Sequence, residues 1–340
     1  MTLPRPDPAT IDAFLKWAID GDSRTATRFA LDLLDQGVPG DEIIVDLLGG
    51  AQHEVGERWV RNVWTVADEH LVSGATQRAL DAVANTVDPP NSEGLVVVAC
   101  AEGDWHSLPA QMFAELLRSR GFVVAFLGAS TPADHVARLL SRGGADALAV
   151  SCNLPLFFGG VTRLAEAAHR YGIPVIAGGR ALGSGPARAI GLGADAWAGG
   201  IEEAAGILRG WQRQRPSSWS QPKMPDRTTI ELEIETPRIA AEAFRSLMTS
   251  YPWMTDYEER QLARTREDLA FITRFVAAAR LVDDPIVLTE FIGWLRTVLS
   301  NRGVPPISLR AGLEALAPIL GRTDPPAGEL VLEAVTSVVD

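Results

Sequence analysis

The apolar run at residues 96–100 constrains the fold of this chain more than any other feature. Polar and apolar residues do not alternate in it, which fits a strand that is covered on both faces of a sheet. A polar loop follows, then an amphipathic segment at residues 110–120 and a second apolar run at residues 123–127. This strand–helix–strand order predicts a doubly wound parallel sheet, in which ligands bind at the carboxyl ends of the strands.

The same alternation continues along the next hundred residues. Three more strands are expected, at residues 147–151, 174–177 and 196–197. Three more helices are expected, at residues 132–142, 160–171 and 201–212, the first of them capped by Thr131. Strands that alternate with helices of this length imply a parallel sheet. Residues 93–212 are therefore predicted to form a Rossmann-like α/β domain.

Residues 8–87 show the pattern of helices instead. Asp7 and Asp22 are suitable N-cap residues, because a short carboxylate can accept a bond from a backbone N–H of the first turn. Two apolar stripes are expected to pack together, one with Ile43, Ile44, Leu47 and Leu48 and one with Val66, Leu71, Ala75 and Leu80. A four-helix bundle is therefore predicted, followed by a proline-containing linker at residues 88–92.

Composition excludes several classes of protein. With 340 residues, two or three domains are expected, and a net charge of -12 argues against binding to nucleic acid, which needs a basic surface. No apolar run is long enough to span a membrane, and the amino terminus has no signal-peptide pattern. The two cysteines, Cys100 and Cys152, lie in apolar segments and are predicted to be buried thiols of a cytoplasmic protein.

Chemically distinctive residues follow three of the predicted strands. Asp104 and His106 follow the first strand, Ser151 and Leu154 the third, and Gly178-Gly179 the fourth. A lone Asp-x-His is most often a surface loop, but a carboxylate can also orient a metal-binding imidazole. The combined pattern resembles the cobalamin-binding domain of methionine synthase, corrinoid proteins and CarH-type photoreceptors.

That resemblance implies a role for each of these residues. His106 would be the lower axial ligand of cobalt, and Asp104, His106 and Ser151 would form a hydrogen-bonded relay. Ser151, Gly178 and Gly179 would line the slot for the nucleotide tail of the cofactor, where only glycine leaves room for a close backbone approach. The family usually has a glycine three residues after the histidine, and Pro109 stands there instead.

The helical region narrows the resemblance further. Trp59 is followed by Glu69 and His70 at the spacing found in CarH-type light sensors, which bind adenosylcobalamin. By this resemblance, Trp59 packs on the adenosyl group, and Glu69 and His70 complete the pocket above the corrin ring. Those sensors have a histidine directly after the tryptophan, and Val60 stands there in this chain. The residues alone leave another interpretation open, a core tryptophan beside a surface pair.

Residues 213–227 are predicted to be a second linker, and residues 228–340 a compact all-α domain. Its five helices are expected at residues 237–249, 256–279, 285–299, 308–320 and 326–338, with Ser308 as a cap. This domain resembles the non-haem sensor globins. No histidine follows His169 and no cysteine follows Cys152, which argues against haem ligation and against a thioether-bound chromophore.

A CarH-like unit joined to a histidine-free, globin-like domain resembles the photocobilins, in which the second domain holds a bilin. The resemblance implies non-covalent biliverdin among Tyr257, Phe271 and Phe275, with a propionate near Arg264. The alternative, in which these aromatic residues are core and Arg264 is solvated, stays open for each residue. The predicted function is a light sensor, not an enzyme, that acts on an unidentified output protein or by self-association as a homo-oligomer. The alternatives are a corrinoid methyl carrier of a methyltransferase system and a purely structural partner.

Overall fold

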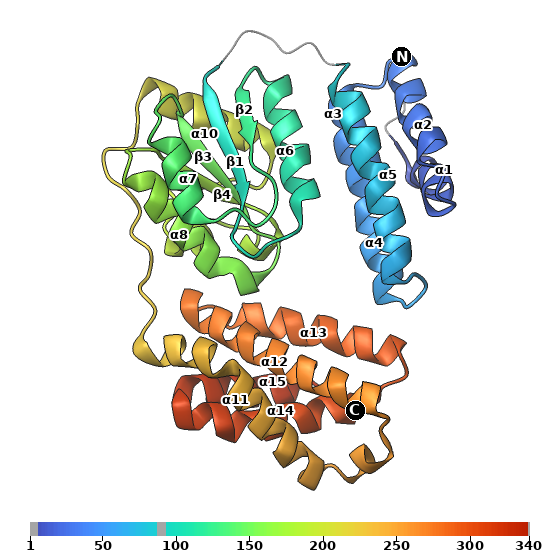
Figure 1. Cartoon of the computed structure of the whole chain (residues 1–340), viewed down its shortest axis with the longest axis vertical. Helices are drawn as coiled ribbons and strands as arrows, with labels where there is room; N and C mark the ends of the chain where they lie inside the picture. Colours follow the sequence, from blue (N-terminus) through green and yellow to red (C-terminus); the bar gives the residue numbers. More distant parts are fainter. Residues whose placement is uncertain (1–5, 87–92, 339–340) are drawn as a thin grey trace. The chain divides into compact units, whose positions relative to one another are not determined.

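The computed structural model describes residues 6–86 and 93–338 and divides the chain into two compact units, Met1–Pro222 and Lys223–Asp340 (Figure 1). The first unit holds a helical bundle and an α/β domain, and the second is built from helices. The division falls inside the predicted linker at residues 213–227. The other predicted linker, residues 88–92, lies outside the described residues.

The bundle contains α1 (Pro8–Ile19), α2 (Ser23–Asp35), α5 (Val66–Ala84) and a helix in three joined parts, α3 (Gly40–Glu42), η1 (Ile43–Gly49) and α4 (Gly50–Val60). Both predicted aspartate caps are confirmed, because Asp7 accepts a hydrogen bond from the N–H of Thr10 and Asp22 accepts one from the N–H of Thr25. The middle part, η1, is a π-helix. Such a segment changes the direction in which later side chains project, and it was not predicted from the sequence.

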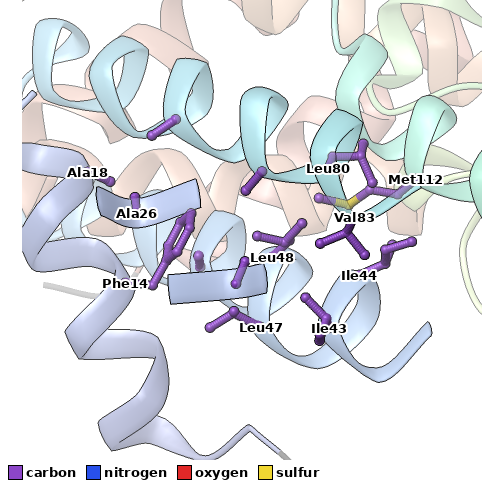
Figure 2. Close-up of a cluster of buried hydrophobic side chains, with 14 of the residues drawn as sticks. Phe14, Ala18, Ala26, Ile43, Ile44, Leu47, Leu48, Leu80, Val83 and Met112 are labelled. Carbon is purple, nitrogen blue, oxygen red and sulfur yellow. The ribbon is translucent and has the colours of Figure 1, made fainter. Parts of the chain in front are cut away.

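The core of the bundle extends into the α/β domain. Figure 2 shows Met112, from the first helix of the α/β domain, beside Ile44, Leu80 and Val83 of the bundle. The first predicted stripe is confirmed, since its four residues are all buried. The second is only partly right: Ala75 and Leu80 are buried, whereas Val66 and Leu71 are exposed. A shared core of this kind fixes the bundle against that helix.

The α/β domain contains a five-stranded parallel sheet in the order β2-β1-β3-β4-β5 (Figure 1). Its strands are β1 (Leu95–Cys100), β2 (Val123–Phe126), β3 (Ala147–Ser151), β4 (Val175–Gly178) and β5 (Ala196–Trp197). The predicted parallel sheet after a helical region is therefore confirmed. The strand order reverses between β1 and β3, so the crevice at their carboxyl ends is the expected ligand position.

Helices cover both faces of this sheet. On one face, α6 (Ser107–Ser119) and α10 (Ile201–Arg213) pack against alternate strand residues, among them Val96, Val98 and Cys100. On the other, α8 (Phe158–His169) packs on β3 and β4, with α7 (Ala133–Leu140) beside it (Figure 1). Three short elements complete the domain: η2 (Pro155–Phe157), η3 (Arg180–Leu182) and α9 (Ala187–Gly191). Burial of both faces explains the unbroken apolar strands.

The second unit contains α11 (Arg227–Ser250), η4 (Pro252–Asp256), α12 (Glu259–Val282), α13 (Ile286–Asn301), α14 (Pro306–Thr323) and α15 (Pro325–Ser337). Arg280 of α12 joins two other parts of this unit, because its guanidinium lies 2.7 Å from the buried carboxylate of Asp324 and 3.3 Å from that of Asp226. The described part of the unit, residues 223–338, is all helical. Its globin-like character stays a prediction.

Three local expectations about helix ends are wrong. The helix predicted to begin at Pro237 begins at Arg227, because Asp226 caps it through the N–H of Thr229, and the proline is accommodated inside. Thr131 does not cap α7, which begins after Pro132 with no side-chain cap. Ser308 lies inside α14, where its hydroxyl contacts the hydroxyl of Tyr251 at 2.9 Å.

Candidate functional site at the carboxyl ends of the strands

The loop after β1 holds a buried carboxylate against a histidine. Asp104 is fully buried, and its Oδ1 lies 2.7 Å from Nδ1 of His106 and accepts the backbone N–H of the same residue at 3.0 Å. The N–H of Asp104 in turn donates to the carbonyl of Ala101 at 2.9 Å. These bonds fix both the ring and the backbone of His106, and they leave Nε2 as the nitrogen that can ligate a metal.

The other carboxylate oxygen of Asp104 is held by the loop after β3. The backbone N–H of Asn153 donates to Oδ2 at 2.6 Å, and the Asn153 amide donates to the carbonyl of His106 at 3.3 Å and to Oγ of Ser151 at 3.4 Å. The two loops at the switch point are thereby joined. Among the hydrogen bonds of the described chain, none links Ser151 directly to Asp104 or His106, so the predicted three-residue relay runs through Asn153 instead.

The electrostatic surroundings of His106 favour its protonated form when no metal is bound. The hydrogen bond that His106 donates to the Asp104 carboxylate raises the pKa of His106, and the charges of Asp104 and Glu69 add to this effect, while burial opposes it. The side chain is 54% exposed, so Nε2 can reach a ligand from solvent. A metal at this site therefore competes with a proton for the imidazole.

Both cysteines lie beneath the same site. They are fully buried, and burial, with a smaller contribution from the Asp104 charge, raises the pKa of Cys100 to about 12 and that of Cys152 well above its usual range. Both are therefore thiols at neutral pH, as predicted, and neither offers a thiolate to a metal. Imidazole is the better ligand here.

At the end of β4, the backbone of the predicted glycine pair passes close to two neighbouring segments of the chain. A Cβ at Gly179 would lie 2.4 Å from the carbonyl oxygen of Cys152, and the residue has φ +106. A Cβ at Gly178 would lie 3.3 Å from the carbonyl oxygen of Ala198. Only glycine fits at Gly179, which leaves a smooth backbone edge next to Ser151, the register partner of Gly178.

The bundle contributes acidic and aromatic residues. Trp59 is half-buried near the end of α4, and Glu69 lies in the first turns of α5, with Oε2 at 3.3 Å from Nε2 of His70. Because the Glu69 charge acts on the pKa of His106, this face of α5 lies within electrostatic reach of the loop after β1. The His70 ring is 74% exposed. Val60, which occupies the position of the light-sensor histidine, is half-buried.

The four candidate bilin contacts in the second unit differ in exposure. Tyr257 precedes α12, contrary to the prediction that it lies on that helix, and its hydroxyl is 3.4 Å from that of Ser308. Phe275 is buried and stacks on Phe291 with a centroid distance of 3.7 Å, whereas Phe271 is 44% exposed. Arg264 is exposed and pairs with Glu267 at 2.6 Å.

The strand-end site fits a corrinoid cofactor. His106 offers one imidazole nitrogen, which suits a metal that brings its other ligands in a macrocycle. Asn153 was missed at the sequence level. Its contact with Asp104 runs through a backbone N–H, which any residue type supplies.

Comparison with known proteins agrees with this fit. Residues 94–208 match a B12 binding domain family, and residues 10–84 match a second family of the same description. The HTH-type transcriptional repressor CarH of Myxococcus xanthus is 32% identical over 148 residues. That match covers 42% of this chain and 48% of CarH, so the chain spans about half the length of this curated relative.

The monomethylamine corrinoid protein of Methanosarcina barkeri has the same fold over 58% of this chain and 96% of its own, with a TM-score of 0.51 and 19% identity. No helix within residues 6–86 and 93–338 is long and apolar enough to cross a membrane. The strand-end geometry and the two family matches together identify this chain as a cobalamin-binding protein with two B12 binding domains, at residues 10–84 and 94–208.

Proposed function

We propose that this protein is a light sensor that binds adenosylcobalamin between its helical bundle and the carboxyl ends of its strands. One observation carries the proposal: the His106 imidazole is oriented by the fully buried Asp104 at the carboxyl ends of the strands, in the same compact unit as the helical bundle. An imidazole held in this way suits a cobalt cofactor that takes one ligand from the protein. The 32% identity with the CarH repressor supports the same assignment.

Each predicted residue has a part in this function. Nε2 of His106, with its ring oriented by Asp104, would hold the cobalt, and Ser151, Gly178 and Gly179 would lie beside the nucleotide tail. Trp59, Glu69 and His70 would contact the adenosyl group. When bound, adenosylcobalamin would supply a light-labile cobalt–carbon bond.

The second unit is proposed to hold non-covalent biliverdin, which would widen the range of absorbed wavelengths. Its supports are the sequence resemblance, the lack of cysteine after Cys152, and the exposed Phe271. Among the four candidates, Phe271 and Arg264 have the most exposed side chains and are the proposed bilin contacts, whereas Phe275 is buried and Tyr257 is half-buried. Signalling then passes to a separate output protein or to a second copy of the chain.

The test is an absorption spectrum of the full chain with adenosylcobalamin, before and after green light, with and without biliverdin. We expect a stable cofactor complex in the dark, spectral loss of the alkyl–cobalt bond on illumination, and a bilin band that separates from the protein on acid denaturation. His106→Ala should leave the cofactor without its protein ligand and shift the spectrum to that of the unligated form.

Equal affinity for methylcobalamin and adenosylcobalamin in the dark, with no change on illumination, would instead favour the methyl-carrier alternative. Absence of a bilin band would remove the biliverdin part of the proposal and leave the cobalamin part intact. An unchanged spectrum in His106→Ala would show that the ligand assignment is wrong.

A further inference from the structure

A chain of polar side chains runs between two helices of the bundle and ends at Glu69. Oγ of Ser73 lies 2.8 Å from Oε1 of Glu69 and 3.0 Å from Oε1 of Gln52. The Gln52 amide nitrogen lies 2.9 Å from Oγ1 of Thr76, which is fully buried. The four side chains come from α4 and α5 and form one continuous series of hydrogen bonds between the two helices.

We infer that Gln52, Ser73 and Thr76 are positioning residues, which hold the Glu69 carboxylate in place to recognise the upper ligand of the bound cofactor. The inference rests on the proposed function and deepens it. Thr76 is buried, and the other three side chains are half-buried. Polar groups removed from water are costly unless each has a partner, and here each member contacts the next. The arrangement therefore calls for a role beyond packing.

Counting hydrogens gives the chain a direction. A hydroxyl carries one hydrogen, so Ser73 can donate either to Gln52 or to Glu69, but not to both. If Gln52 donates to Thr76 and accepts from Ser73, Glu69 itself must supply a proton to Ser73. Exchanging the oxygen and nitrogen of the Gln52 amide, which share a nearly identical shape, reverses every bond.

The hydroxyl of Thr76 lies 2.9 Å from both the Gln52 amide and the carbonyl of Val72. In the reversed direction Thr76 donates to Gln52 in place of Val72, Gln52 donates to Ser73, and Ser73 donates to the carboxylate of Glu69. An ionised Glu69 selects this direction, because all donors then have acceptors. Its Oε1 is held by Ser73 and its Oε2 lies 3.3 Å from Nε2 of His70, so the carboxylate is held from both sides. A carboxylate held in this way accepts hydrogen bonds from a ligand hydroxyl, such as those of a ribose.

The geometry of α4 places Gln52 and Trp59 on one side of the bundle. They are two helical turns apart and so share a face of this helix. Trp59 thus supplies apolar contact, and the polar chain that ends at Glu69 supplies polar contact, from the same pair of helices. A methyl group has no hydroxyl, so this polar chain should strengthen the binding of adenosylcobalamin and leave that of methylcobalamin unchanged.

The experiment measures dark affinities for adenosylcobalamin and methylcobalamin by absorbance titration of the full chain. Gln52→Leu and Ser73→Ala should each weaken adenosylcobalamin binding about tenfold, the usual scale for loss of one good hydrogen bond, and leave methylcobalamin affinity unchanged. Ser73→Thr restores a hydroxyl and should recover most of the loss. Gln36→Leu, the same replacement at an exposed position in the bundle, is the matched control.

A double variant separates positioning from general stability. Because the polar chain acts through Glu69, adding Gln52→Leu to a Glu69→Gln variant should not weaken adenosylcobalamin binding any further. The inference is overturned if Gln52→Leu and Ser73→Ala leave the preference unchanged, if they weaken both cofactors alike, or if their effect persists beside Glu69→Gln. A wild-type chain that binds no cobalamin, or that shows no preference, would instead overturn the proposed function itself.

Discussion

Asp104 and His106 are coupled at the scale of single residues, and the coupling has a sign. The hydrogen bond that His106 donates to the Asp104 carboxylate raises the pKa of His106 in the folded protein. The stabilisation that comes from this bond is therefore complete below the unfolded pKa of histidine and is lost as pH rises through the higher folded value. Metal ligation needs the neutral ring, so cobalamin ligation should weaken as pH falls through the same range.

We predict that Asp104→Asn lowers the pKa of His106 in the cofactor-free protein, because the amide gives no charge to the imidazolium. The histidine titration followed by NMR measures this, and the pH midpoint for His-ligated cobalamin should move down with it. Asp134→Asn is the control, since Asp134 lies beside the exposed His135. An unmoved midpoint in Asp104→Asn would mean that Asp104 does not control this proton.

Sequence distance decides which of these contacts can be predicted. Asp104 and His106 are two residues apart, and a short loop brings them together by local geometry alone. The bond from Asn153 to Asp104 instead spans two loops that meet only because β1 and β3 are neighbours in the sheet. A backbone donor leaves no mark on the residue type. The Asp–His pair was therefore predictable, and its second partner was not.

At the scale of elements, the turn that ends β4 depends on Gly179. A Cβ there meets the backbone of Cys152 at 2.4 Å and also requires φ +106. Backbone strain of a non-glycine residue at such a φ costs about 1–3 kcal/mol, and Gly179→Ala should destabilise the first unit by more than this strain alone. The substitution should also weaken cobalamin binding. Thermal unfolding and cofactor titration measure the two effects. Gly144→Ala is matched, because Gly144 has φ +92 but nothing within 4 Å.

A Gly179→Ala chain no less stable than Gly144→Ala would show that the backbone edge can yield, and the glycine argument would fail.

Helix ends show the same division between local and distant causes. Asp7 and Asp22 cap their helices through bonds three residues away, which the sequence displays directly. Ser308 also has the right residue type, but tertiary contact with Tyr251 takes its hydroxyl, and its helix begins earlier at Pro306. The prediction that Tyr257 lies on a helix is wrong for a related reason, since α12 begins at Glu259. Helical periodicity was extended past the true start of this helix.

At the scale of the whole chain, residues 214–222 join the two units, and they lie along the first unit as a strap. Trp219 stacks on His169 with a centroid distance of 5.0 Å, and the N–H of Ser220 donates to Asp195 at 2.9 Å. Asp195 is also 2.8 Å from Nε2 of His169. Arg215 donates to the carbonyl of Gly172 at 3.0 Å.

The strap contacts His169 and Gly172, which precede β4, and Asp195, which precedes β5. It therefore crosses the amino edge of the sheet, opposite the strand ends that hold His106. Composition alone predicted a plain linker there. Proline and serine content says nothing of a tryptophan that stacks on a distant histidine.

We predict that Trp219→Ala releases the strap without affecting the cofactor. Loss of a stacked aromatic pair is worth about 0.5–1.5 kcal/mol beyond burial, so the open population and the rate of tryptic cleavage after Arg213 should rise up to about tenfold. Cobalamin affinity should not change, because the site lies at the other edge of the sheet. Trp253→Ala, at a tryptophan 67% exposed in the second unit, should leave cleavage at Arg213 unchanged. Equal cleavage of wild type and Trp219→Ala would show that Trp219 does not hold the strap, and a parallel loss of cobalamin binding would show that the two edges are coupled.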